Sequence, residues 1–353
     1  MLPAFILYAP YIGAKLCHDS VDFDFSGRVS DRVFSLAVGL ILSQRPLAVL
    51  AGMPEDEFQA AATATSDIAP VAVSKARLRD GLEIDVRQLS ANGIDPPLLI
   101  LLHGSGWYGQ QFDALLPALA KHADVIAPDL RGHGPQAKLR GDVAYIGQLE
   151  DDIADLIDLY ARPEQKIVLA GHSSGGGLAI RFLAGAHGDR VTSAILLAPF
   201  LKYNAPTMRP NAGGWSRPLV RRFIGLSLLN AVGVTVLNHL TVLQFAFPEF
   251  VLNTVHKVAL TRAYTYRMNL SHEPRSDYLS DIAALPRFDL IVGQDDKFFI
   301  ADAFKPLMRA VTDKGQYHMI QTRGHLNLLY APETLQIIKA ASVKPESWDF
   351  HWD

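Results

Sequence analysis

Alternating stretches of apolar and polar residues predict a series of strands along most of the chain. Residues 71–79 and 82–89 alternate apolar and polar side chains about a central Asp-Gly pair, which is the pattern of a β-hairpin. Continuous apolar runs at 97–102 and 167–170 are instead typical of strands buried on both faces of a parallel sheet. Similar runs predict further strands at 124–127, 194–198, 287–292 and 316–322.

Helical periodicity is found between these strands. The clearest case is 149–160, where apolar residues recur on one face and three acidic residues suit the positive N-terminal end of a helix. Strands that alternate with helices indicate a doubly wound, mostly parallel α/β sheet, which we assign to residues 71–199 and 285–345. The other helices are predicted near 111–122, 178–186, 301–311 and 332–341.

Two segments lack this alternation. Residues 200–284 are long-looped and rich in apolar residues, so we interpret them as a helical lid inserted at the strand ends, where ligands bind in such sheets. The apolar residues between 226 and 247 exceed the needs of one amphipathic face. They either form an acyl pocket or pack the lid onto the main domain. Residues 1–70 are an N-terminal extension of unknown role, which could pack on the main domain, lie on a membrane surface or be poorly ordered.

Composition and charge exclude several classes of function. The net charge is −3 and no basic block is present, so we expect no nucleic acid partner. The single cysteine, Cys17, excludes an intrachain disulfide and a thiolate cluster. No zinc-binding histidine spacing, G-x-G-x-x-G or P-loop motif is present, so we expect neither a metal nor a cofactor.

No stretch of the sequence is a convincing membrane span. The closest, 33–52, contains Gln44-Arg45-Pro46 in its middle. An apolar stretch after Arg28 and Arg32 has the composition of a signal-peptide core but lies far from the start of the chain. We therefore expect a cytoplasmic protein, with peripheral membrane contact through the N-terminal extension as the alternative.

The strongest chemical motif is Gly-His-Ser-Ser-Gly at 171–175. It follows a buried strand and precedes a helix, which is the context that a G-x-S-x-G nucleophile elbow requires. A serine on such a tight turn needs neighbours without a Cβ, and Gly171 and Gly175 meet this need. Its hydroxyl is a weak nucleophile, so it needs a base and a group that orients the base.

Both groups are available downstream of the elbow. Asp295 and Asp296 follow one predicted strand, and His325 follows the last strand. Each therefore lies at the same edge of a parallel sheet as Ser173, where the three side chains can converge. The order Ser, Asp, His is that of α/β-hydrolases.

Five segments in order carry a resemblance to the α/β-hydrolase superfamily over residues 71–345, in particular to its lysophospholipase, monoacylglycerol lipase and serine aminopeptidase-like branch. The resemblance implies that Ser173 is the nucleophile, Asp296 the acid and His325 the general base. The acid of the family usually falls three residues after a glycine, which favours Asp296 over Asp295. The five segments are His103-Gly104, 129–134 (Asp-Leu-Arg-Gly-His-Gly), 171–175, Gly293 to Asp296, and Gly324-His325.

An oxyanion hole follows from the same geometry. One donor is the backbone N–H of Ser174, at a helix N-terminus where the dipole favours negative charge. The other is expected from the loop after the strand at 97–102, with Ser105 favoured over Gly106 and Trp107.

A serine nucleophile implies an acyl-enzyme. We expect a serine carboxylic ester hydrolase that acts on a small-molecule ester with a lipophilic or medium-chain acyl group. The alternatives are a peptidase or amidase, a carbon–carbon bond hydrolase, and a non-catalytic ligand-binding protein of this fold. Structural roles are expected for His103 and His133, and elbow packing away from the base for His172. His272, in the insertion, could touch substrate or serve packing.

Overall fold

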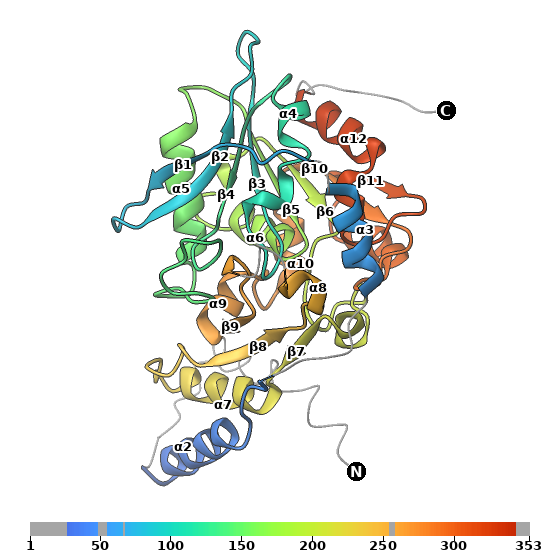
Figure 1. The fold of residues 1–353 in the computed structure, drawn as a ribbon. Helices are drawn as coiled ribbons and strands as arrows, with labels where there is room; N and C mark the ends of the chain where they lie inside the picture. Colours follow the sequence, from blue (N-terminus) through green and yellow to red (C-terminus); the bar gives the residue numbers. More distant parts are fainter. Residues whose placement is uncertain (1–26, 49–54, 66–67, 254–257, 344–353) are drawn as a thin grey trace.

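An eight-stranded sheet forms the centre of the described structure (Figure 1). The computed structural model describes residues 27–48, 55–65, 68–253 and 258–343. The strand order is β1-β2-β4-β3-β5-β6-β10-β11, antiparallel between β1, β2 and β4 and parallel from β4 to β11. The strands are β1 (Val73–Arg77), β2 (Glu83–Leu89), β3 (Leu98–Leu102), β4 (Asp124–Pro128), β5 (Ile167–His172), β6 (Ser193–Leu197), β10 (Arg287–Gly293) and β11 (Gly315–Ile320).

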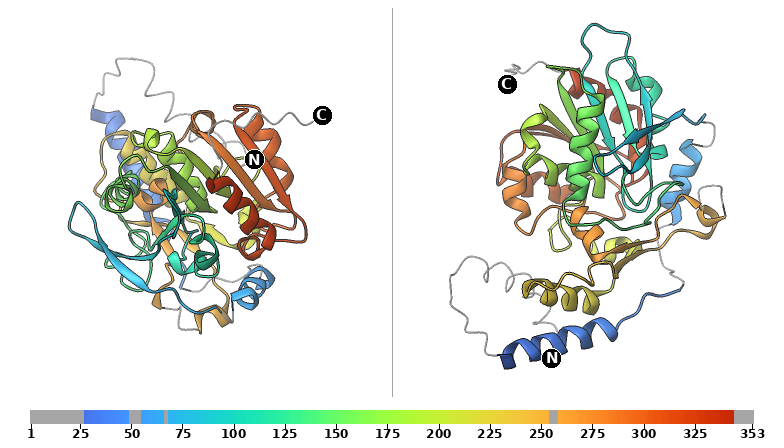
Figure 2. Two further views of the ribbon diagram at one scale, coloured as in Figure 1. Left: turned by 90° about the horizontal axis from the view of Figure 1, so that it is seen from above. Right: turned by 90° about the vertical axis from the view of Figure 1, so that its left-hand side faces the viewer.

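The central strands are buried because helices cover both faces of the sheet (Figure 2). Every residue of β3 and β5 is buried, as their continuous apolar sequences require. Helices α4 and α12 contact each other, and α6 contacts both α5 and α10. The predicted doubly wound, mostly parallel sheet is therefore confirmed. The helices are α4 (Leu116–Leu119), α5 (Gln148–Tyr160), α6 (Ser174–Leu183), α10 (Tyr278–Ala283), α11 (Phe304–Arg309) and α12 (Pro332–Val343).

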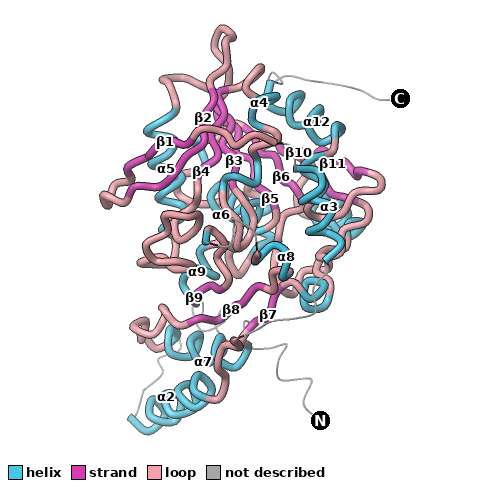
Figure 3. The backbone as a smooth tube through the Cα atoms, in the orientation of Figure 1, coloured by secondary structure: helices cyan, strands magenta, loops and turns pink. Residues whose placement is uncertain are grey.

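Residues 200–284 contain several helices and, in addition, a small sheet that the sequence analysis did not predict. The sheet is antiparallel, in the order β7-β8-β9, and lies apart from the main sheet (Figure 3). The local reason is the run 241–245, which buries alternate side chains at its start as a strand does. The added elements are β7 (Ser216–Pro218), β8 (Thr241–Phe245), β9 (Ala263–Thr265), α7 (Val220–Ala231), α8 (Glu249–Leu252) and α9 (Tyr266–Ser271).

The described parts of the N-terminal extension pack on the rest of the protein. Helix α2 (Gly27–Leu42) lies along α7, where the backbones are so close that a Cβ on Gly225 would lie 2.6 Å from the carbonyl oxygen of Ala37. Helix α3 (Glu55–Thr65) lies beside the loop that follows β11. Among the described residues, no helix is long and apolar enough to cross a membrane. Residues 1–26 lie outside the described structure.

Candidate active site

Ser173 occupies a strained turn between β5 and α6. Its backbone angles are φ 55° and ψ −121°, a conformation that costs a non-glycine residue energy and is concentrated at functional sites. The glycines on either side are required by space: a Cβ on Gly171 would lie 2.2 Å from the carbonyl oxygen of Gly175. The turn is held because the Ser173 N–H donates to the carbonyl of Leu197 at 2.9 Å.

Asp296 and His325 form a buried pair. The Nδ1–H of His325 donates to Oδ2 of Asp296 at 2.8 Å, and the two side chains are 3% and 1% exposed. The other oxygen of Asp296 accepts the N–H groups of Phe298 and Phe299, at 2.7 and 2.8 Å. The carboxylate is therefore fixed in the orientation that leaves Nε2 of His325 as a hydrogen-bond acceptor. Asp295 is exposed and makes no such contact with His325.

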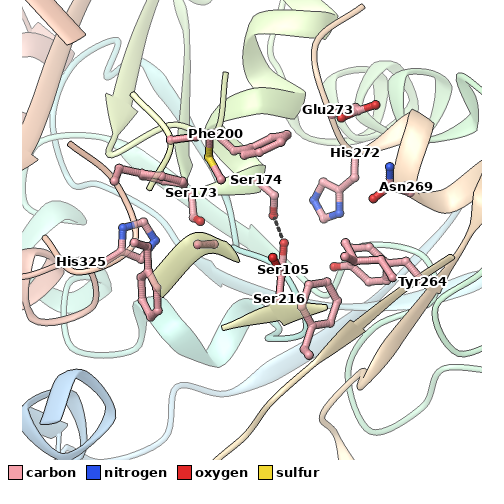
Figure 4. A pocket seen from close by; sticks show the side chains of 16 residues that line it. Ser105, Ser173, Ser174, Phe200, Ser216, Tyr264, Asn269, His272, Glu273 and His325 are labelled. Atoms are coloured by element: carbon pink, nitrogen blue, oxygen red, sulfur yellow. Dashed lines mark hydrogen bonds between the residues drawn. The ribbon is translucent and has the colours of Figure 1, made fainter. Parts of the chain in front are cut away.

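Ser173 and His325 line the same pocket (Figure 4). The hydroxyl of Ser173 makes no hydrogen bond to any residue that the structure describes, and neither does Nε2 of His325. Catalytic hydrogen bonds are often long before substrate binds and tighten in the complex. The pocket thus holds a free hydroxyl and an oriented imidazole nitrogen facing one space.

Backbone donors are available beside Ser173. The N–H of Gly106 donates to the hydroxyl of Tyr264 at 3.0 Å, and that of Trp107 to the carbonyl of Gly104 at 3.3 Å. Within the described chain, the N–H of Ser105 has no acceptor, and Ser174 is the first residue of α6, whose N–H no helix bond uses. Of the three candidates after β3, only Ser105 leaves its N–H available for an oxyanion.

The pocket has an apolar part and a polar part, and its water-accessible volume is about 70 Å³. The apolar part is lined by Phe200, Met208, Ala212, Leu243, Phe245, Phe298 and Phe299. The polar part is lined by Ser105, Ser216, Tyr264, Asn269, His272 and Glu273.

Most apolar residues of 226–247 pack elsewhere. Leu226 and Leu229 are buried against Ala37 and Ile41 of α2. Of the apolar residues in this run, Leu243 and Phe245 line the pocket. Most of this run therefore forms neither an acyl pocket nor a contact with the main domain, because it packs in a cluster that includes α2 of the N-terminal extension.

His172 contacts His325, the expected base, which corrects the expectation that it points away. Its ring centre is 4.7 Å from that of His325, and its Nε2–H donates to the His325 carbonyl at 3.0 Å. Nδ1 of His172 accepts from the side chain of Gln111, whose oxygen accepts the N–H of Gly104. Burial and the neighbouring imidazole lower the pKa of His172 well below its usual range, so the ring is neutral. It connects the loop after β3 to the loop of His325.

Glu57 of α3 was not identified from the sequence. Its carboxylate is 4% exposed and accepts three backbone N–H groups: those of His325 at 3.0 Å, Leu326 at 3.2 Å and Lys297 at 3.2 Å. Lys297 directly follows Asp296. One side chain from the N-terminal extension thus joins the loops of the acid and the base. Its only sequence signal was an acidic helix start, which is usually solvated.

His103 and His133 have the structural hydrogen bonds that were expected. Nε2 of His103 accepts the N–H of Leu130 at 3.1 Å. Nε2 of His133 accepts the hydroxyl of Tyr264 at 2.6 Å, and burial lowers the pKa of His133 to about 4. Both rings are therefore neutral and occupied by protein partners.

Comparison with known proteins identifies the family. A family model described as the α/β-hydrolase family matches residues 99–335. The chain belongs to the α/β-hydrolase family. It is 37% identical over 115 residues to a pyrethroid hydrolase from Sphingobium wenxiniae, a match that covers 32% of this chain and 38% of that protein.

Solved structures of this family share the fold. An esterase from Thermogutta terrifontis has a TM-score of 0.53 at 22% identity, with 76% of this chain and 97% of that chain covered. A monoacylglycerol lipase from Paleococcus ferrophilus has a TM-score of 0.54 at 17% identity, with 74% and 96% covered. Both comparisons show that this chain has the α/β-hydrolase fold.

Proposed function

We propose that this α/β-hydrolase is a serine hydrolase that cleaves carboxylic esters through an acyl-enzyme. The observation that carries the proposal is the shared pocket of the strained Ser173 and the buried Asp296–His325 pair. Such a constellation is recognised by geometry and role. The name of the pyrethroid hydrolase and those of esterases with this fold agree with hydrolysis of an ester.

In the proposed reaction, Ser173 Oγ attacks the ester carbonyl carbon while Nε2 of His325 takes its proton. The oxyanion of the tetrahedral intermediate accepts the N–H groups of Ser105 and Ser174. Collapse of the intermediate breaks the bond to the alcohol oxygen, which receives the proton from His325. A water molecule, deprotonated by the same nitrogen, then attacks the acyl carbon and releases the acid and Ser173.

We propose a short acyl group and an apolar alcohol. The expectation of a medium-chain acyl group depended on the apolar run at 226–247, most of which belongs to a separate cluster that includes Ala37 and Ile41 of α2. A cavity of about 150 Å³ holds one benzene molecule, whereas this pocket offers about 70 Å³. The alcohol must lie near His325, and there the rings of Phe298 and Phe299 meet the imidazole edge-on at 4.7 and 4.9 Å.

The test is labelling by a fluorophosphonate probe together with turnover of p-nitrophenyl esters from acetate to octanoate. We expect the wild type and the Ser43→Ala control to be labelled, and Ser173→Ala to be neither labelled nor active. We expect kcat/KM to fall beyond the butyrate ester. Labelling that survives Ser173→Ala contradicts the assignment of the nucleophile, and faster hydrolysis of aminoacyl arylamides than of esters favours the amidase alternative.

A further inference from the structure

The polar part of the pocket contains a histidine without a partner. His272 follows α9 and is 2% exposed, yet neither of its ring nitrogens has a hydrogen-bond partner among the described residues. Leaving a buried polar atom without a hydrogen-bond partner destabilises a protein. Because His272 lines the pocket, a bound ligand can supply the missing partners.

The chemistry of His272 limits what this ligand group can be. Burial and the nearby His133 lower the pKa of His272 well below its usual range, so the ring is neutral. A neutral imidazole has one N–H donor and one acceptor nitrogen. A hydroxyl, which also donates and accepts, suits either nitrogen. The neighbouring Glu273 already pairs with Lys202 at 3.0 Å, so no unpaired charge is present here for an ionised group.

The position of His272 indicates which part of the substrate it meets. In Figure 4, the hydrogen-bonded Ser105–Ser174 pair lies between Ser173 and His272, and His325 lies on the opposite side of Ser173. The leaving alcohol must be next to His325, because that residue protonates it. The acyl group therefore extends past the oxyanion donors, towards His272 and Asn269.

We propose that His272 binds a hydroxyl group on the acyl portion of the substrate, so that the enzyme prefers esters of short hydroxy acids. Asn269, at the same end of the pocket, offers an amide to the same group. This inference rests on the proposed ester hydrolysis, and it adds the class of acyl group.

The experiment compares two p-nitrophenyl esters of nearly equal shape, 3-hydroxybutyrate and 3-methylbutyrate. We expect the wild type to favour the 3-hydroxybutyrate ester by about tenfold or more in kcat/KM. The 3-methylbutyrate ester has no acyl hydroxyl, so it leaves both nitrogens of His272 unpaired. His272→Leu should reduce this ratio to near one or invert it. His239→Leu, the same change at an exposed histidine of the insertion, should leave the ratio unchanged.

The outcomes separate the two proposals. Hydrolysis of both esters with no preference in the wild type overturns the role of His272, and so does an unchanged ratio in a folded His272→Leu variant. The wild-type ratio decides by itself if that variant does not fold. Absence of hydrolysis together with absence of fluorophosphonate labelling instead contradicts the ester hydrolase proposal, and the role of His272 with it.

Discussion

At the scale of single residues, Asp296 and Asp295 have identical side chains but different chemistry. Asp296 is 1% exposed, accepts two backbone N–H groups and contacts His325, whereas Asp295 faces solvent. Both residues lie in the turn after β10, which leaves Asp295 exposed and buries Asp296. The same substitution at Asp296 and at Asp295 therefore tests which of the two carboxylates orients His325.

We predict that Asp296→Asn lowers kcat by about 10³–10⁴. An amide cannot hold the proton on Nδ1 of His325, so the tautomer with an acceptor at Nε2 is lost. Asp295→Asn should change kcat by less than about twofold, since surface substitutions have small effects. Steady-state kinetics on one p-nitrophenyl ester measures both; comparable losses in the two variants would contradict the assignment.

At the scale of elements, α3 connects the N-terminal extension to the catalytic loops. Glu57 fixes the backbone of Lys297, 240 residues later, and that of His325, 268 residues later, so the separation of the proposed acid and base depends on a distant helix. Phe58, the next residue, packs its ring 5.3 Å from Trp215, which anchors α3 on the insertion as well. The extension is thus part of the proposed catalytic structure.

We predict that Glu57→Ala lowers kcat about 10- to 100-fold with little change in KM. Without the Glu57 carboxylate the loop of His325 can shift, and displacement of a catalytic group by about 1 Å reduces the rate by such a factor. Fluorophosphonate labelling should slow in parallel at temperatures well below Tm. Glu57→Gln, which keeps one acceptor oxygen, should restore part of the rate. Asp56→Ala is the control, since Asp56 is exposed and pairs only with Lys297. A Glu57→Ala variant with a lower Tm but an unchanged kcat would show that Glu57 is purely structural.

At the scale of the whole molecule, three buried histidines link folding to pH. The ring of His133 lies 4.9 Å from that of His103 and 5.6 Å from that of His272. Burial lowers the pKa of each, to about 4 for His133. The unfolded chain binds these protons near pH 6.5, so it binds more protons than the folded chain between pH 6.5 and 4. Stability is therefore lost as the pH falls through this window.

We predict that His133→Gln flattens the decline of unfolding free energy between pH 6.5 and 4 by up to about 1.4 kcal/mol per pH unit, the value for one proton. Burial also raises the pKa of Asp129 to about 6, which favours the folded state as the pH falls. Comparing variant and wild type by urea unfolding at each pH cancels this opposing contribution. Equal slopes in the two proteins would contradict the prediction.

The sequence by itself determined the features that depend on residues close together in the chain. Apolar runs predict buried strands because a strand that is buried on both faces needs apolar side chains at consecutive positions. The glycines of 171–175 permit the strained turn at Ser173. The order of Ser173, Asp296 and His325 was also readable, since the ends of parallel strands meet at one edge. The positions of Ser173 and His325 at one pocket, with Asp296 bonded to His325, follow from that rule and from the observed sheet order.

Only the tertiary structure decided the features that depend on segments far apart in the chain. The apolar run at 226–247 was expected to form an acyl pocket or to pack on the main domain, but most of it packs in a cluster with α2 of the N-terminal extension. The sequence analysis did not single out Glu57, whose contact with the loop of His325 depends on where α3 packs. The sequence left His272 with two possible roles, contact with substrate or packing, and only the structure shows that it lines the pocket with both ring nitrogens unpaired among the described residues. In each case the deciding contact joins segments that no local pattern relates, because burial is a property of the folded chain.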